Sequence, residues 1–115
     1  MAELDVNERQ AGDVTILDLS GEVRIGDSSV ALRNSIRKLA DAGKKKVLLN
    51  LAGVKYIDSS GIGELIASYA TVTRQNGQLK LLNLTDRIQN LLVITKLLTV
   101  FDSYDNESEA LKSFQ

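Results

Sequence analysis

Residues 47–65 have the sequence VLLNLAGVKYIDSSGIGEL, an apolar run followed by a polar turn that contains glycine. The run at 47–51 is short, almost wholly apolar and flanked by turn-forming residues, which is typical of a parallel strand covered on both faces. From about residue 60 to residue 75 the apolar side chains recur at helical spacing, and Gly77 follows. The two segments together predict a central strand that leads directly into a helix.

Further strands and helices alternate on both sides of this unit. An antiparallel pair is expected at the N-terminus, with an edge strand at 4–9 and a strand at 14–19 that Ser20 and Gly21 close. A helix at 27–42 follows, and its start can be capped by Asp27, Ser28 or Ser29. Beyond the central unit, the pattern predicts a strand at 79–84, a helix capped by Thr85 or Asp86, a short strand at 100–101 and a final helix that Asn106 caps and that extends through Phe114.

This alternation predicts an α/β fold. We expect a mixed, mainly parallel sheet of roughly four to five strands, with an N-terminal antiparallel hairpin and about four flanking helices. The chain has 115 residues, of which 43 % are apolar and 25 % charged, and this balance predicts a single folded domain over residues 1–115. No proline, Gly/Ser tract or internal repeat marks a linker.

Composition excludes several classes of chemistry. The chain has no cysteine and no histidine, which rules out disulfides, thiol nucleophiles, Ser-His-Asp triads and thiolate or imidazole zinc sites. The formal net charge of −1 gives no basic field for nucleic acid, and we interpret Lys44, Lys45 and Lys46 as a solvated strand entry. No apolar stretch approaches the roughly 20 residues of a membrane span, and the N-terminus lacks a secretory signal pattern. We expect a cytoplasmic protein with no cofactor, metal, nucleic-acid or membrane partner.

The turn at 58–63 is the candidate functional segment, because open α/β sheets place their ligands outside the carboxyl ends of strands. Ser59 or Ser60 is expected to cap the helix, and Gly61 and Gly63 to leave its first turn open to another molecule. A phosphate-binding loop is disfavoured because the segment has no lysine, and a serine nucleophile because no histidine can serve as its base. The residues alone favour a capped strand-to-helix turn.

The same residues also resemble a known family. The runs VLLNL at 47–51 and IDSSGIG at 57–63, with Val54 between them, are similar to the signature of STAS domains, the anti-sigma factor antagonist family. The resemblance spans nearly the whole chain and includes LSGE at 19–22, residues 77–84, VFD at 100–102 and EAL at 109–111.

This resemblance implies a switch protein and not an enzyme. When dephosphorylated, such a domain binds an anti-sigma factor that is also a serine kinase, and thereby frees a sigma factor. The family pattern implies Ser59 as the phosphorylated residue and a metal-dependent serine phosphatase as a second partner, with nucleotide and metal held by those partners. It implies a partner surface made by Asp58, Ser60, Gly61, Ile62 and Gly63 together with Arg24, Gly26 and Asp27. We expect a monomer. The alternative is a STAS scaffold or adaptor in a signalling complex that is not switched by phosphorylation.

Two positions depart from the family pattern. Many relatives have Gly-x-Leu-Asp before the first helix, whereas this chain has Arg24 at the last of these four positions, which bears on partner choice. The family's third helix often ends at Gly-Leu, whereas this chain has Lys96-Leu97. Lys96 is therefore predicted to adopt a left-handed backbone conformation that glycine would adopt more easily.

Overall fold

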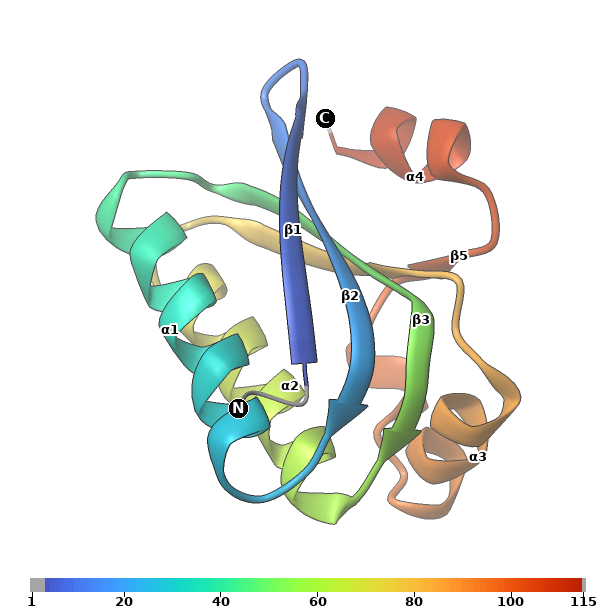
Figure 1. Ribbon diagram of the computed structural model, residues 1–115. Coiled ribbons are helices and arrows are strands. Elements are labelled where there is room, and N and C mark those ends of the chain that lie inside the picture. Colours follow the sequence, from blue (N-terminus) through green and yellow to red (C-terminus); the bar gives the residue numbers. More distant parts are fainter. Residues whose placement is uncertain (1–3, 115) are drawn as a thin grey trace.

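The computed structural model describes residues 4–114 and contains one five-stranded sheet, in which the strands follow the order β1-β2-β3-β4-β5 (Figure 1). The elements along the chain are β1 (Leu4–Ala11), β2 (Val14–Val23), α1 (Asp27–Asp41), β3 (Lys46–Ile57), α2 (Ser59–Thr73), β4 (Gln78–Leu82), α3 (Asp86–Ile94), the 3-10 turn η1 (Leu98–Val100), β5 (Ser103–Tyr104) and α4 (Glu107–Ser113). β1 is antiparallel to β2, and the other neighbouring strands are parallel. This confirms the predicted α/β fold with its N-terminal hairpin.

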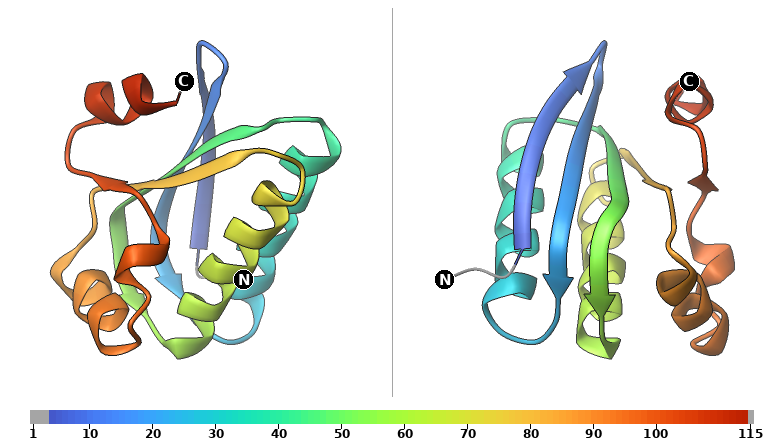
Figure 2. Two further views of the ribbon diagram at one scale, coloured as in Figure 1. Left: turned by 180° about the vertical axis from the view of Figure 1, so that it is seen from behind. Right: turned by 45° about the vertical axis from the view of Figure 1, so that its right-hand side comes forward.

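The sheet separates two apolar clusters. On one face α1 and α2 lie side by side and, with α3, enclose the larger core, to which Val47, Leu49 and Leu51 of β3 contribute (Figures 1 and 2). On the other face α4 covers a smaller cluster that includes Leu48 and Phe114. Alternate side chains of β3 therefore enter opposite clusters, as expected of an apolar central strand that is covered on both faces.

The strands that lead to the candidate site are longer than predicted. β2 continues through Ser20 and Gly21, and its pairing with β3 shifts register around them, with Gly21 at φ 110°. The predicted stop at these residues is wrong because they form an irregularity of the bulge type inside the strand. Pairing then continues to Val23 and Ile57, so both strands end at the same rim of the sheet.

The segment after α3 also differs in part from the prediction. Residues 98–100 form η1 and the strand begins only at Ser103, so the predicted strand at 100–101 is wrong. Phe101 instead enters the larger core, where its ring packs edge-to-face on Tyr69 at 5.4 Å. The left-handed conformation predicted for Lys96 is confirmed, with φ 62°.

Helix bounds agree closely with the predicted ones, and so do two of the caps. Thr85 and Asn106 accept hydrogen bonds from the backbone at the starts of α3 and α4. At α1, by contrast, the N-cap is Gly26, so the prediction that Asp27, Ser28 or Ser29 caps this helix is wrong. Ser29 Oγ donates to the Gly26 carbonyl and caps nothing. Within residues 4–114, no helix combines the length and apolarity that a bilayer crossing requires.

Candidate functional site

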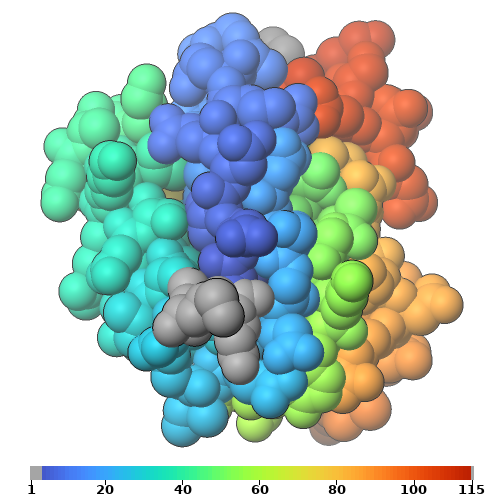
Figure 3. Space-filling model, in the orientation of Figure 1, coloured from blue at the N-terminus to red at the C-terminus, as the bar shows by residue number. Residues whose placement is uncertain are grey.

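The candidate site lies at the rim where β2 and β3 end and α1 and α2 begin. Because Val23 and Ile57 are partners in the sheet, the segment 24–26 and the turn at Asp58 leave it next to each other. Figure 3 shows the first segment in blue and the end of β3 in green at the lower end of the molecule, beside α3 in orange. The structure thus brings together the two groups of predicted partner-binding residues.

Asp58 organises this rim. It is the N-cap of α2, with φ −110° and ψ −175°, and its Oδ1 accepts a hydrogen bond from the Gly61 amide at 2.9 Å. Its Oδ2 accepts a longer bond, 3.4 Å, from the Ile25 amide, while its own amide donates to the Val23 carbonyl at 3.3 Å. One carboxylate therefore caps the helix and joins the β2–α1 segment to the β3–α2 turn.

The β2–α1 segment is held by its own hydrogen bonds as well. Ser28 Oγ accepts from the Arg24 amide at 2.9 Å and donates to the Arg24 carbonyl at 3.0 Å. Gly26 has φ 107°, a conformation that side chains rarely adopt. Asp27 is exposed at the first position of α1, and the Ile25 side chain is 77 % exposed. Ile25 was missed at the sequence level, because a single aliphatic residue in a loop gives no periodic signal.

Ser59 stands at the first position of α2, and both Ser59 and Ser60 are exposed. The prediction that one of them caps the helix is wrong, since Asp58 supplies the cap. Within the described part of the chain neither hydroxyl has a hydrogen-bond partner. Ser59 lies where the positive end of the helix dipole and the first free amides of α2 favour an anion.

The two glycines of the motif differ. Gly61 is buried, and a Cβ there would lie 2.4 Å from the Val23 carbonyl oxygen and 2.6 Å from Ile57 Cγ1. The expectation that Gly61 leaves the helix open to another molecule is wrong, because β2 and β3 already occupy that space. Gly63 is exposed and has no such neighbours, as predicted. Ile62 is only 2 % exposed and Leu65 is fully buried, so both belong to the core.

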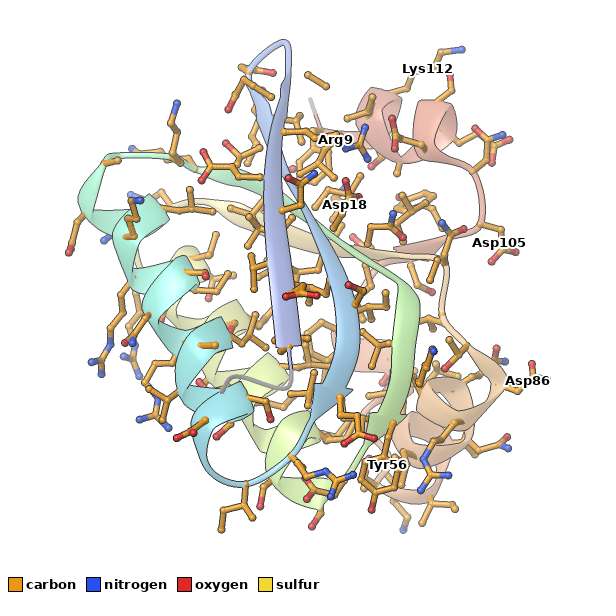
Figure 4. The ribbon with its side chains drawn as sticks, in the orientation of Figure 1. Arg9, Asp18, Tyr56, Asp86, Asp105 and Lys112 are labelled. Atoms are coloured by element: carbon orange, nitrogen blue, oxygen red, sulfur yellow. The ribbon has the colours of Figure 1, made fainter. Side chains whose placement is uncertain are left out.

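A cationic and aromatic cluster completes the rim. The guanidinium carbons of Arg24 and Arg87 lie 4.7 and 4.2 Å from the centroid of the Tyr56 ring. Both guanidinium groups are therefore within cation–π distance of the same ring. Arg24 also pairs with Glu22. Figure 4 shows Tyr56 at the lower end of β3, next to α3.

The role of Tyr56 and Arg87 was missed because the three members come from the β2–α1 segment, β3 and α3. The available signal was the alternation of β3, which places Tyr56 on the same side of the strand as Asp58.

The rim exposes polar groups and the Ser59 hydroxyl. Among residues 4–114, no cluster of three or more Asp, Glu, His or Cys side chains could hold a metal ion.

Comparison with known proteins gives a consistent result. The family model described as STAS domain matches residues 5–110. The anti-sigma-B factor antagonist of Bacillus subtilis is 31 % identical over 86 % of this chain and 89 % of its own length. The structure of an anti-sigma factor antagonist from Mycobacterium paratuberculosis superposes with a TM-score of 0.85 at 19 % identity, covering 96 % of this chain and 93 % of that one.

The Bacillus cell fate determinant SpoIIAA has the same fold. In its phosphorylated form it matches with a TM-score of 0.75 at 18 % identity, over 96 % of this chain and 100 % of that one. In its unphosphorylated form, where it is described as an anti-sigma factor antagonist, the TM-score is 0.71.

Proposed function

The chain belongs to the STAS domain family, and on that premise we propose that it is an anti-sigma factor antagonist switched by phosphorylation of Ser59. In this proposal the unmodified chain binds an anti-sigma factor of the serine kinase type through the rim around Asp58, and so releases a sigma factor. The kinase phosphorylates Ser59 and ends the binding, and a metal-dependent serine phosphatase restores it. Nucleotide and metal belong to these partners, and the chain itself acts by binding in the cytoplasm.

The observation that carries this proposal is the setting of Ser59. Ser59 is exposed at the start of α2, between Asp58, which caps the helix, and Gly61, which packs against β2 and β3. A kinase can therefore reach the hydroxyl without unfolding the helix. The names of the relatives also support this proposal, since one is an anti-sigma-B factor antagonist and SpoIIAA has been solved in a phosphorylated form.

A phosphoryl group at Ser59 would change charge far more than structure. It adds about −1.5 to −2 charge at pH 7, and a helix N-terminus stabilises an anion by roughly 0.3–1 kcal/mol. The Asp58 carboxylate beside it opposes this gain, so the fold is neither strongly stabilised nor lost. The effect falls on the partner, whose contact surface would meet added bulk, desolvation cost and repulsion of its acidic groups.

Among the predicted contacts, exposed residues are the ones that can touch a partner directly. They are Ser60, Gly63, Gly26 and Asp27, with Ile25 added by the structure. Gly61 and Ile62 are buried, so we assign them to shaping the rim. Arg24 pairs with Glu22 and lies against Tyr56, and we infer that this cluster forms one side of the partner surface.

The test compares Ser59→Asp and Ser59→Asn, two variants of the same size at one exposed position, of which only the first adds a negative charge. Each is titrated calorimetrically into a purified anti-sigma factor of the kinase type from the same organism, with wild type as reference. We expect Ser59→Asp to abolish measurable binding and the kinase to phosphorylate wild type but not Ser59→Ala. If wild type binds and Ser59→Asp binds equally well, the switch is wrong and the unswitched scaffold is supported.

A further inference from the structure

The most exposed large apolar side chains of residues 4–114 gather in two segments, 25–30 and 93–100. They are Ile25, Val30, Val93, Ile94 and Val100. Single exposed apolar residues are normal on a protein surface, whereas grouped ones mark interaction sites. The β2–α1 segment and α3 lie at the same end of the molecule, on either side of the β3–α2 turn (Figures 1 and 2). The two apolar groups therefore flank the turn that carries the candidate site.

One side of α3 continues the rim. Ile88 and Leu92 of this helix are buried, whereas Arg87 is exposed and the Ile94 side chain is 74 % exposed. Ile94 follows Arg87 by almost two helical turns, so both lie on the same side of α3, about 10 Å apart along its axis. Arg87 belongs to the rim because its guanidinium carbon lies 4.2 Å from the centroid of the Tyr56 ring. The surface around Ile94 is therefore continuous with the rim.

The end of α3 holds its exposed apolar side chains on a fixed backbone. The Leu97 amide donates to the Leu92 carbonyl at 2.8 Å, and the Lys96 amide donates to the Val93 carbonyl at 3.0 Å. With Lys96 at φ 62°, these are the two hydrogen bonds of a Schellman cap. η1 follows directly, and Phe101 then anchors the chain in the larger core. Because this backbone is already ordered, binding through it has a smaller entropy cost.

We propose that the anti-sigma factor which binds the rim also covers the end of α3, with Ile94 and Ile25 as apolar anchors on the two sides of Ser59. This inference rests on the proposed function and adds the chemistry of the partner, whose surface is apolar at two points. The arginines and the tyrosine of the rim lie in the same surface, and these residue types are enriched at the centres of protein interfaces. A phosphoryl group on Ser59 would then enter an interface that excludes water, where an unpaired charge is costly.

The experiment measures the affinity of a purified anti-sigma factor of the kinase type from the same organism for wild type, Ile94→Ser, Ile25→Ser and Gln89→Ser. Gln89 is the matched control, because it is exposed on the same helix but lies about 140° around it from Ile94. Ile25 and Ile94 are 77 and 74 % exposed, so their side chains contribute little to the core. Each variant is therefore expected to keep a Tm close to that of wild type. Sedimentation velocity of wild type and Ile94→Ser reports self-association.

We expect Ile94→Ser and Ile25→Ser each to weaken binding about tenfold or more, as the burial of one aliphatic side chain implies, and Gln89→Ser to bind like wild type. If wild type binds and Ile94→Ser binds equally well, the contact along α3 is overturned while the switch at Ser59 stands. If wild type does not bind the anti-sigma factor, the proposed function fails, and this inference fails with it. A wild-type dimer that Ile94→Ser dissociates would also overturn the inference, because a second copy of the chain would then cover α3.

Discussion

Alanine substitution of the two glycines of the Asp-Ser-Ser-Gly-Ile-Gly motif should change the free energy of unfolding in opposite directions. In Gly61→Ala the new methyl carbon would lie 2.4 Å from the Val23 carbonyl oxygen, whereas ordinary van der Waals contact begins at 3.4 Å. The start of α2 would have to move by about 1 Å against the backbone of β2, and overpacking of this kind costs about 1–3 kcal/mol. In Gly63→Ala the methyl group meets open space on a helix. Alanine there should stabilise the fold by about 0.4–1 kcal/mol.

Urea denaturation of the two variants and wild type measures this difference. We expect the midpoint to fall for Gly61→Ala and to rise for Gly63→Ala, with an unchanged slope m, so that the change is one of stability alone. By thermal denaturation, each kcal/mol corresponds to a shift in Tm of about 4–8 °C for a domain of this size. If Gly61→Ala were as stable as wild type, or if the two variants moved together, the assignment of Gly61 to a packed contact with β2 would be refuted.

Three further outcomes follow from other contacts. Asp58→Ala should lower the free energy of unfolding by about 1 kcal/mol through loss of the α2 cap, and Asp58→Asn should retain most of it, as measured by urea denaturation. Hydrogen bonds from Arg9 hold the pKa of Asp18 below its usual value of about 3.9, so this carboxylate stabilises the fold above that pH. That stability should be lost as the pH falls through the lowered pKa, and in Asp18→Asn the acid part of a stability–pH profile should be flatter. Lys96→Gly should raise Tm, because glycine relieves the positive φ at the end of α3. A matched change of Lys112, on another helix, should not do so.

Periodicity and capping chemistry carried most of the fold prediction. The apolar run at 47–51 predicted β3, because a strand that is buried on both faces is apolar at successive positions. The spacing after Ser60 predicted α2, because a helix that is buried on one face repeats its apolar residues every three to four positions. Asn106 and Thr85 were recognisable caps, since their short polar side chains reach the backbone amides of the first helical turn. Local chemistry of this kind is present in the sequence itself.

Features set by tertiary packing were not predictable in the same way. Ser20 and Gly21 are typical turn residues, yet they pair with β3 and lie inside β2. Asp58, Ser59 and Ser60 are all residue types that cap helices, so the sequence does not show that Asp58 caps α2. Its hydrogen bond from the Ile25 amide forms because β2 and β3 end at the same rim. The contacts of Arg24 and Arg87 with the Tyr56 ring likewise depend on three segments far apart in the chain.

We propose that a phosphoryl group on Ser59 controls partner binding without altering the fold. The most direct measurement is the affinity of a kinase-type anti-sigma factor for the chain with phosphoserine at position 59, compared with the unmodified chain. We expect binding to be lost in the phosphorylated form, while ¹H–¹⁵N spectra change only around the start of α2 and the adjoining β2–α1 segment. Equal affinity of the two forms, or spectral changes throughout the sheet, would contradict it.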